Sequence, residues 1–199
     1  MQLLINKKAN IHATDCHGCV PLHYAAQGGH DPSIQLLLRL KANCNAVDSH
    51  SLLPIHHAAK HNAVNAIKVI LQKTSQQQLQ TADENGKTPF LFSAENGALH
   101  AAKHFIEIDS SVLSQVDTGK KTAVHLAAQH GQLAMLKYLL EASADIEALT
   151  DDSKTAYDIA KESGDSQVIK FFKKLSKPSK RKGSASSPRS SPRKSRKKV

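Results

Sequence analysis

The sequence predicts an all-α solenoid of stacked helix-turn-helix units with β-turn fingers, followed by a disordered basic tail. A seven-residue phrase recurs along the chain, beginning at residues 20, 53, 88, 122 and 155, so the steps are 33, 35, 34 and 33 residues. A turn rich in Asp, Asn and Gly precedes the phrase, and apolar residues at helical spacing follow it. Such a period indicates a repeat array in which each unit stacks on its neighbours.

The phrase and the residues before it predict a turn and then the first helix of each unit. It reads VPLHYAA, LPIHHAA, TPFLFSA, TAVHLAA and TAYDIAK in chain order. In the preceding turns Asp and Asn can bond their own backbone, and Gly adopts positive φ without strain. Thr opens the last three phrases and is expected to cap the helix, and Pro stands just inside the helix in the first three. These residues are Thr88, Thr122, Thr155, Pro21, Pro54 and Pro89.

A second helix is predicted in each unit from apolar residues three or four positions apart. One unit cannot bury such a face alone, so stacking must create a continuous core. Small Ala pairs in the first helices allow neighbouring helices to approach closely. The residues expected in the core are Ile34, Leu37, Leu38, Ile67, Ile70, Leu71, Leu136, Leu139 and Leu140.

The period near 33 residues and the T-P-L-H-x-A-A core resemble the ankyrin repeat family. On this resemblance we expect repeats at 15–47, 48–82, 83–116 and 117–149, a polar capping repeat at 150–175 and a tail at 176–199. Residues 1–14 resemble only the second half of a repeat, so the chain is expected to be the C-terminal piece of a longer array. Non-glycine residues stand where the family has Gly, and lower stability than that of a consensus array is expected; they include Lys41, Ser51, Lys120 and Ser143.

The resemblance implies a non-enzymatic scaffold or adaptor that holds a protein partner on its concave face. The expected contact residues at the turn tips are Cys16, His17, Cys19, Ser49, His50, Leu52, Glu84, Asn85, Lys87, Thr118, Lys121, Asp151, Asp152 and Lys154. Those on the first helices are Gln27, Lys60, His61, Glu95, Asn96, Gln129, His130 and Glu162. Leu52 is a large apolar residue at a tip that is usually solvated, which indicates either a partner hot spot or a locally drifted unit.

The positive charge is confined to the tail. All 17 acidic residues and 17 of the 27 basic residues precede residue 176, so the array is formally neutral and the net charge of +10 belongs to the last 24 residues. That segment is almost entirely Ser, Pro, Lys, Arg and Gly, and it is expected to be disordered because it has too little apolar surface to bury.

Two basic clusters in the tail resemble a bipartite nuclear import signal, which implies an importin-type receptor and a nuclear location. Direct contact with chromatin or RNA is the alternative, and a merely solubilising tail is a third reading. The clusters comprise Lys180, Arg181, Lys182, Arg193, Lys194, Arg196, Lys197 and Lys198. Ser187 and Ser191 precede prolines and resemble proline-directed phosphorylation sites. A phosphate there adds about −1.5 to −2 charges and is expected to weaken import or nucleic-acid contact.

The sequence favours no catalytic, cofactor, metal or membrane function. No P-loop, G-x-S-x-G or H-E-x-x-H motif occurs, and no apolar run approaches the roughly 20 residues of a membrane span. A monomer is expected.

The segment from Cys16 to Cys19 invites a metal reading, with His12, His23 and Cys44 as further ligands. Because no second C-x-x-C pair exists and these positions correspond to exposed turns, no metal site is expected. The resemblance implies that the histidines closing the T-P-L-H phrase bond the backbone of the adjoining turn, whereas His57 is expected to be exposed. The phrase histidines are His23, His56 and His125.

Overall fold

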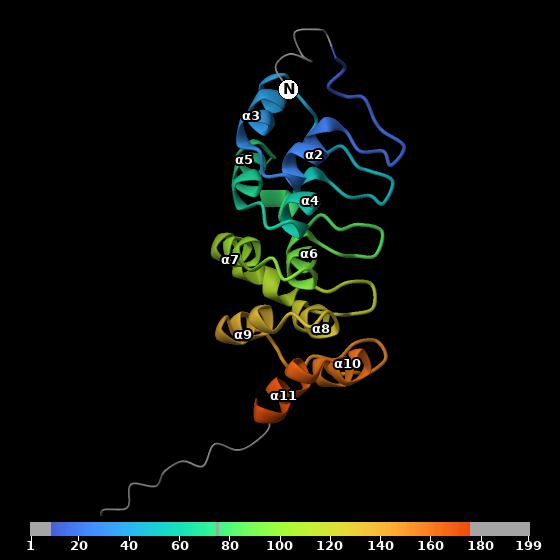
Figure 1. Ribbon diagram of the computed structural model, residues 1–199, viewed down its shortest axis with the longest axis vertical. Coiled ribbons are helices and arrows are strands. Elements are labelled where there is room, and N and C mark those ends of the chain that lie inside the picture. Colours follow the sequence, from blue (N-terminus) through green and yellow to red (C-terminus); the bar gives the residue numbers. More distant parts are fainter. Residues whose placement is uncertain (1–8, 75, 176–199) are drawn as a thin grey trace, which may run out of the picture.

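The computed structural model describes residues 9–74 and 76–175, and in these ranges helix pairs stack along one axis (Figure 1). The first helices are α2 (Pro21–Gln27), α4 (Pro54–Lys60), α6 (Pro89–Glu95), α8 (Ala123–Gln129) and α10 (Ala156–Ser163). The second helices are α3 (Asp31–Arg39), α5 (Val64–Thr74), α7 (Leu99–Ile108), α9 (Leu133–Glu141) and α11 (Ser166–Leu175). The described ranges contain no strand, only an isolated bridge between Val116 and Thr122. The predicted all-α stack of helix pairs is confirmed.

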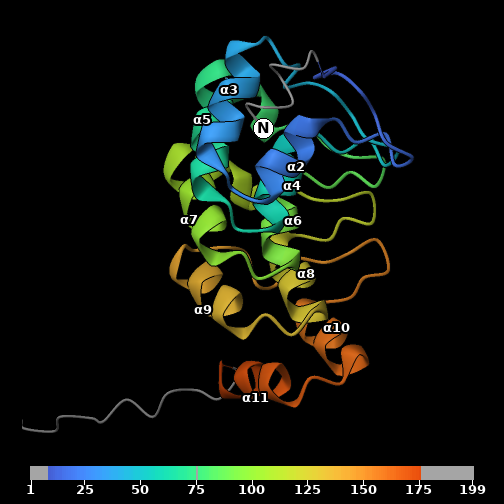
Figure 2. The same ribbon diagram turned by 45° about the horizontal axis from the view of Figure 1, so that its top comes forward.

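The first and second helices form two rows, and the turns between repeats project on the side of the first helices (Figures 1 and 2). Most of the partial repeat at 1–14 and the whole tail, with its import residues and both serines, lie outside the described residues.

The core follows the predicted apolar stripes. The central positions of the second helices are fully buried, as are the small residues where first helices meet. The fully buried residues among those predicted are Ile34, Leu37, Ile67, Ile70, Leu136 and Leu139. Leu38 and Leu71 are partly buried and pack against this core, and Leu140 is partly buried.

The predicted threonine caps form at two of three helices. The Thr88 hydroxyl accepts the Leu91 N–H at 3.4 Å, and the Thr155 hydroxyl accepts the Asp158 N–H at 3.2 Å. The prediction is wrong for Thr122, whose hydroxyl lies 2.9 Å from Nδ1 of His125 instead. A histidine at this position competes for the hydroxyl that would otherwise cap the helix.

Two short 3-10 helices, η1 (Gln76–Leu79) and η2 (Ser110–Ser114), fill the longer exits of the second and third repeats. Each contributes a buried apolar side chain, Leu79 from η1 and Val112 from η2. The Gln78 amide donates to the Cys44 carbonyl oxygen at 3.2 Å and to Asn45 Oδ1 at 2.7 Å. The extra residues therefore attach each exit to the preceding repeat.

Candidate functional site

The turns between repeats are five-residue fingers, at 15–19, 48–52, 83–87, 117–121 and 150–154. In each, the N–H of the first residue donates to the carbonyl oxygen of the fifth, at 3.0–3.1 Å. Four fingers begin with Asp, whose carboxylate accepts the N–H groups two and four residues later at 2.7–2.9 Å. In the fifth, the Thr150 hydroxyl accepts the Lys154 N–H at 3.2 Å. These bonds fix the backbone of each tip.

Backbone hydrogen bonds join the first finger to the second, the third to the fourth, and the fourth to the fifth, where the Asp151 N–H donates to the Gly119 carbonyl oxygen at 3.1 Å. The Ser49 N–H donates to the His17 carbonyl oxygen at 2.9 Å, and the Thr118 N–H donates to that of Asn85 at 3.0 Å. Gly18 must be glycine here, because it has a φ of +74° and an added Cβ would lie 2.9 Å from the Ser49 nitrogen. Ser51 and Lys120 adopt the same left-handed conformation without being glycine. These bonds connect the fingers into two groups beside the first helices, the first with the second and the third with the fourth and fifth.

Buried histidines on three of the first helices bond the backbone at or just before the next finger, as the resemblance implied. In His56, Nδ1 accepts the Leu53 N–H at 3.0 Å and Nε2 lies 3.1 Å from the Thr81 carbonyl oxygen. His23 and His125 make the same pair of contacts to the following repeat. Burial lowers the pKa of His56 to about 4, so its imidazole is neutral near pH 7 and donates through Nε2–H.

The predicted contact residues differ in exposure. Fourteen are exposed: Cys16, His17, Ser49, His50, Lys60, His61, Glu84, Asn85, Asn96, Thr118, His130, Asp151, Asp152 and Glu162. Seven are half-buried: Gln27, Leu52, Lys87, Glu95, Lys121, Gln129 and Lys154. Cys19 is buried at 7% exposure, so its expected place on an exposed tip is wrong.

Eight of these residues line one hollow of about 230 Å³, called here the central hollow, between the second and third fingers and helices α4 and α6. They are His50, Leu52, Lys60, Glu84, Asn85, Lys87, Glu95 and Asn96; Asp83 and Phe92 complete the lining. A second hollow, of about 430 Å³, lies at the fifth finger and includes Lys121, Gln129, Asp152 and Lys154. Glu162 also lines the second hollow, and the other members of the predicted set line neither one.

Charge is paired inside both hollows. Lys87 Nζ lies 2.8 Å from Glu95 Oε2, and His130 Nε2 lies 3.3 Å from the other oxygen of the same carboxylate. In the second hollow Lys154 Nζ lies 2.7 Å from Glu162. The corresponding finger position in the first two repeats holds Cys19 and Leu52, so the N-terminal half of the face lacks this cationic side chain.

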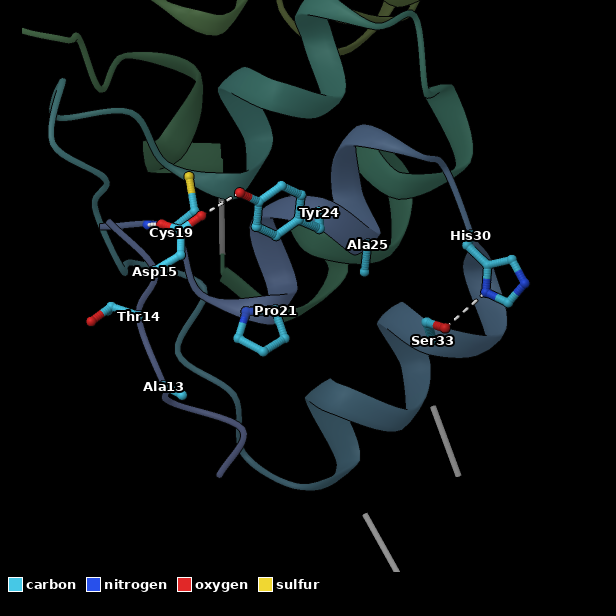
Figure 3. A pocket seen from close by; sticks show the side chains of 9 residues that line it. All are labelled: Ala13, Thr14, Asp15, Cys19, Pro21, Tyr24, Ala25, His30 and Ser33. Atoms are coloured by element: carbon cyan, nitrogen blue, oxygen red, sulfur yellow. Dashed lines mark hydrogen bonds between the residues drawn. The ribbon is translucent and has the colours of Figure 1, made fainter. Parts of the chain in front are cut away.

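The first repeat carries a separate N-terminal pocket of about 560 Å³ (Figure 3). On one side the Tyr24 hydroxyl donates to the Asp15 carboxylate, and on the other His30 Nδ1 lies 2.8 Å from Ser33 Oγ. The bond to Asp15 raises the pKa of Tyr24 to about 12. Tyr24 is 52% exposed and contributes apolar surface at this end of the face.

A buried cluster of Cys19, Asp48 and His57 joins the first two repeats. His57 Nε2 lies 2.9 Å from Asp48 Oδ2, and Cys19 Sγ lies 4.0 Å from the same oxygen. The expectation that His57 is exposed is wrong, because its side chain is only 16% exposed. Within the described ranges, the suggested ligands His12, His23 and Cys44 do not join this group.

Burial and hydrogen bonding set the charges of this cluster. Burial raises the pKa of the Cys19 thiol, and the Asp48 carboxylate adds to the effect. Burial also raises the pKa of Asp48, but hydrogen bonds from His57, Leu52 and His50 outweigh it and lower the pKa overall. For His57, burial lowers the pKa more than Asp48 raises it. Near neutral pH the cluster therefore holds a thiol, a carboxylate and a neutral imidazole.

None of the helices in the described ranges is long and apolar enough to cross a membrane.

Comparison with known proteins places the whole array in one family. A model of ankyrin repeats matches residues 1–81, 55–151 and 92–182. Rabankyrin-5 of Homo sapiens is 29% identical over 157 residues, which cover 78% of this chain and 13% of that protein; Rabankyrin-5 of Mus musculus is 26% identical over the same shares. A homologue of transient receptor potential cation channel subfamily A member 1 in Caenorhabditis elegans is 27% identical over 105 residues, 53% of this chain and 8% of that protein. The chain thus spans a small part of these relatives.

Proposed function

The chain belongs to the ankyrin-repeat family, whose repeats generally mediate protein–protein interaction, and we propose that it is a non-enzymatic scaffold that binds a protein partner on the face of its fingers and first helices. One observation carries this proposal: the central hollow gathers eight predicted contact residues from two repeats, on fingers whose own backbones are fixed by hydrogen bonds to Asp48 and Asp83. The relatives differ in their names, and the chain covers only 13% and 8% of their lengths, so the fold identifies a binding module and leaves the partner open.

The chemistry of the central hollow favours a partner segment that inserts an apolar side chain. Leu52 and Phe92 contribute apolar surface to its lining, and the charge of Lys60 is offset by the carboxylates of Asp83 and Glu84. The charges of Lys87 and Glu95 neutralise each other, so this pair can offer a partner hydrogen bonds but no net charge. Apolar anchors in a desolvated hollow are the usual source of interface energy.

Replacement of Leu52 by Asp tests this site. The side chain is half-buried and makes no core contact of its own, so the variant should fold while its carboxylate disrupts an apolar contact. Leu149→Asp is the matched control, because Leu149 is 53% exposed and lines neither hollow. Quantitative affinity capture from cell extract should retain a protein on the wild type and on Leu149→Asp, with at least about tenfold less on Leu52→Asp. Equal capture by all three would remove Leu52 from the site.

We further propose that the tail directs the scaffold to the nucleus through an importin-type receptor. The neutral array and the concentration of the +10 charge in residues 176–199 support this proposal. A fusion of residues 176–199 to a fluorescent carrier should accumulate in nuclei, and replacement of the basic residues at 193–198 should abolish accumulation. A carrier that stays cytoplasmic would contradict the proposal.

The alternative, in which the tail tethers the protein to chromatin or RNA, has a different salt dependence. A tail that neutralises several phosphates should lose roughly tenfold or more in affinity between 50 and 200 mM salt. Binding of a protein to the central hollow should change little over this range, because that hollow is close to neutral. Titration of the full chain with duplex DNA or RNA at both salt concentrations separates the two functions.

A further inference from the structure

We propose that Cys19, Asp48 and His57 form a site for one zinc ion that links the first and second repeats. The three donor atoms, Cys19 Sγ, Asp48 Oδ2 and His57 Nε2, all lie within 4.8 Å of one another. Thiolate, imidazole and carboxylate together are the donor set that zinc prefers. The sequence has no second C-x-x-C pair, but the fold supplies the other two donors, Asp48 and His57, from the second repeat.

The distances are close to those of a zinc site. Zinc bonds of about 2.0–2.3 Å in a tetrahedral arrangement place two donors about 3.3–3.6 Å apart. The observed separations from Asp48 Oδ2 are 2.9 Å to His57 Nε2 and 4.0 Å to Cys19 Sγ. Side-chain movements below about 1 Å bring all three to bonding positions. Water fills the fourth position in this proposal.

The surroundings of Asp48 suit a ligand. Its Oδ1 accepts the N–H groups of His50 and Leu52 at 2.9 Å, so the finger holds the carboxylate in place. Oδ2 remains for the other two donors, and the side chain is only 5% exposed. Such outer hydrogen bonds orient a metal ligand before the ion arrives.

At two of these three positions, the residue type differs from those at the equivalent positions of the other repeats. The position of Cys19 is otherwise filled by Leu52, Lys87, Lys121 and Lys154. The position of His57 is otherwise filled by Tyr24, Phe92, Leu126 and Ile159. Both departures fall in adjoining repeats and meet at the same carboxylate, which is more buried than the corresponding Asp15, Asp83 and Asp117.

Binding releases one proton per ion. The Cys19 thiol gives its proton to solvent and bonds the metal as a thiolate. The His57 imidazole stays neutral, because its proton moves from Nε2 to Nδ1 and Nε2 becomes a ligand. Zinc, thiolate and carboxylate then sum to zero charge in a buried site, which avoids the cost of an unpaired buried ion.

Cobalt titration of the full-length reduced protein, freed of metal with a chelator, tests the site. One cobalt ion per chain should produce a sulfur-to-cobalt charge-transfer band, and zinc should displace it. Cys19→Ser should abolish the band. His57→Phe, which supplies the ring found at the same position in the third repeat, should weaken binding at least about tenfold. Cys16→Ser and Cys44→Ser should leave the band unchanged.

Zinc should also raise the melting temperature of the wild type and not that of Cys19→Ser, because only a native-state site stabilises the fold. Circular dichroism of each metal-free variant checks folding, and Cys19→Ser alone decides the outcome if His57→Phe does not fold. Absence of the band, or a band that persists in Cys19→Ser, would overturn the proposal.

Discussion

The imidazole of His56 shows how one residue links two repeats. It is fully buried, uses both ring nitrogens and remains neutral because burial lowers its pKa to about 4. An unfolded histidine has a pKa of about 6.5, so between pH 6.5 and 4 the unfolded state binds more protons than the folded state. Stability from this residue is therefore complete above pH 6.5 and falls as the pH decreases towards 4, by up to about 3 kcal/mol.

The pH dependence of unfolding by urea should show this effect. His56→Leu, which places in the second repeat the residue found at this position in the third, removes the titrating group. The variant should be about 1–3 kcal/mol less stable at pH 7, because the Leu53 N–H and Thr81 carbonyl lose their partner. Its stability should fall less between pH 6.5 and 4.5 than that of the wild type. Parallel curves for the two proteins would contradict a buried neutral His56.

Two residues with a left-handed backbone give a second prediction, in which one substitution raises the stability of the protein and the other lowers it. Lys41 has a φ of +66° at the end of the second helix of the first repeat and is exposed, so Lys41→Gly should stabilise the protein by about 1 kcal/mol. Gly18 has a similar φ but no room for a Cβ, so Gly18→Ala should destabilise it by more than about 1 kcal/mol. Equilibrium urea unfolding measures both. A loss of stability in Lys41→Gly would show that its side chain has a structural role.

Residue-level expectations were most accurate where the repeat phrase fixes the environment. The register places His23, His56 and His125 in one buried position, and their contacts follow. The predictions that Cys19 and His57 are exposed were wrong, because both residues pack against Asp48. That residue is 29 positions from Cys19 and 9 positions from His57. The position of a residue in the repeat phrase predicts its location within its own repeat. It does not predict which side chain of the next repeat covers that residue.

At the scale of elements, the exits of the second and third repeats show the limit of periodicity. The helices follow from apolar spacing, whereas η1 lies in a glutamine-rich segment with no such pattern. Of its residues, Gln78 is 4% exposed and Gln76 is exposed, although the two are chemically identical. The difference arises because the Cys44 carbonyl and Asn45 side chain of the preceding repeat accept hydrogen bonds from Gln78.

Gln78→Ala should therefore destabilise the protein by about 1–3 kcal/mol, since the Cys44 carbonyl oxygen and Asn45 lose a donor beneath the turn. Gln77→Ala is a suitable control, because Gln77 is exposed in the same 3-10 helix and should change stability by less than about 0.5 kcal/mol. Thermal or urea unfolding of the two variants compares them directly. Equal effects would mean that the turn does not attach to the preceding repeat.

At the scale of the whole molecule, the repeats contact mainly their sequence neighbours. In the described part of the chain, first helices pack in consecutive pairs from α2 through α10, and each also packs on its own second helix. A linear stack of this kind has stability that is close to a sum of unit and interface terms. Units in the middle have two interfaces and the last has one, so local opening should begin at an end.

Substitution of one phenylalanine in the middle of the stack and of one in its fifth repeat tests whether opening begins at an end. Phe105 lies fully buried in α7, with repeats on both sides, and Phe172 is 7% exposed in α11, where it contacts Tyr157 and Phe171. Either change to Ala should cost about 3–5 kcal/mol locally, but its reach should differ. Hydrogen exchange should show faster exchange across the third repeat and its neighbours in Phe105→Ala, and only in α10 and α11 in Phe172→Ala. Uniform loss of protection from hydrogen exchange in Phe172→Ala would show instead that the array unfolds as one cooperative unit. The interfaces between repeats would then be too stable for one end to open alone.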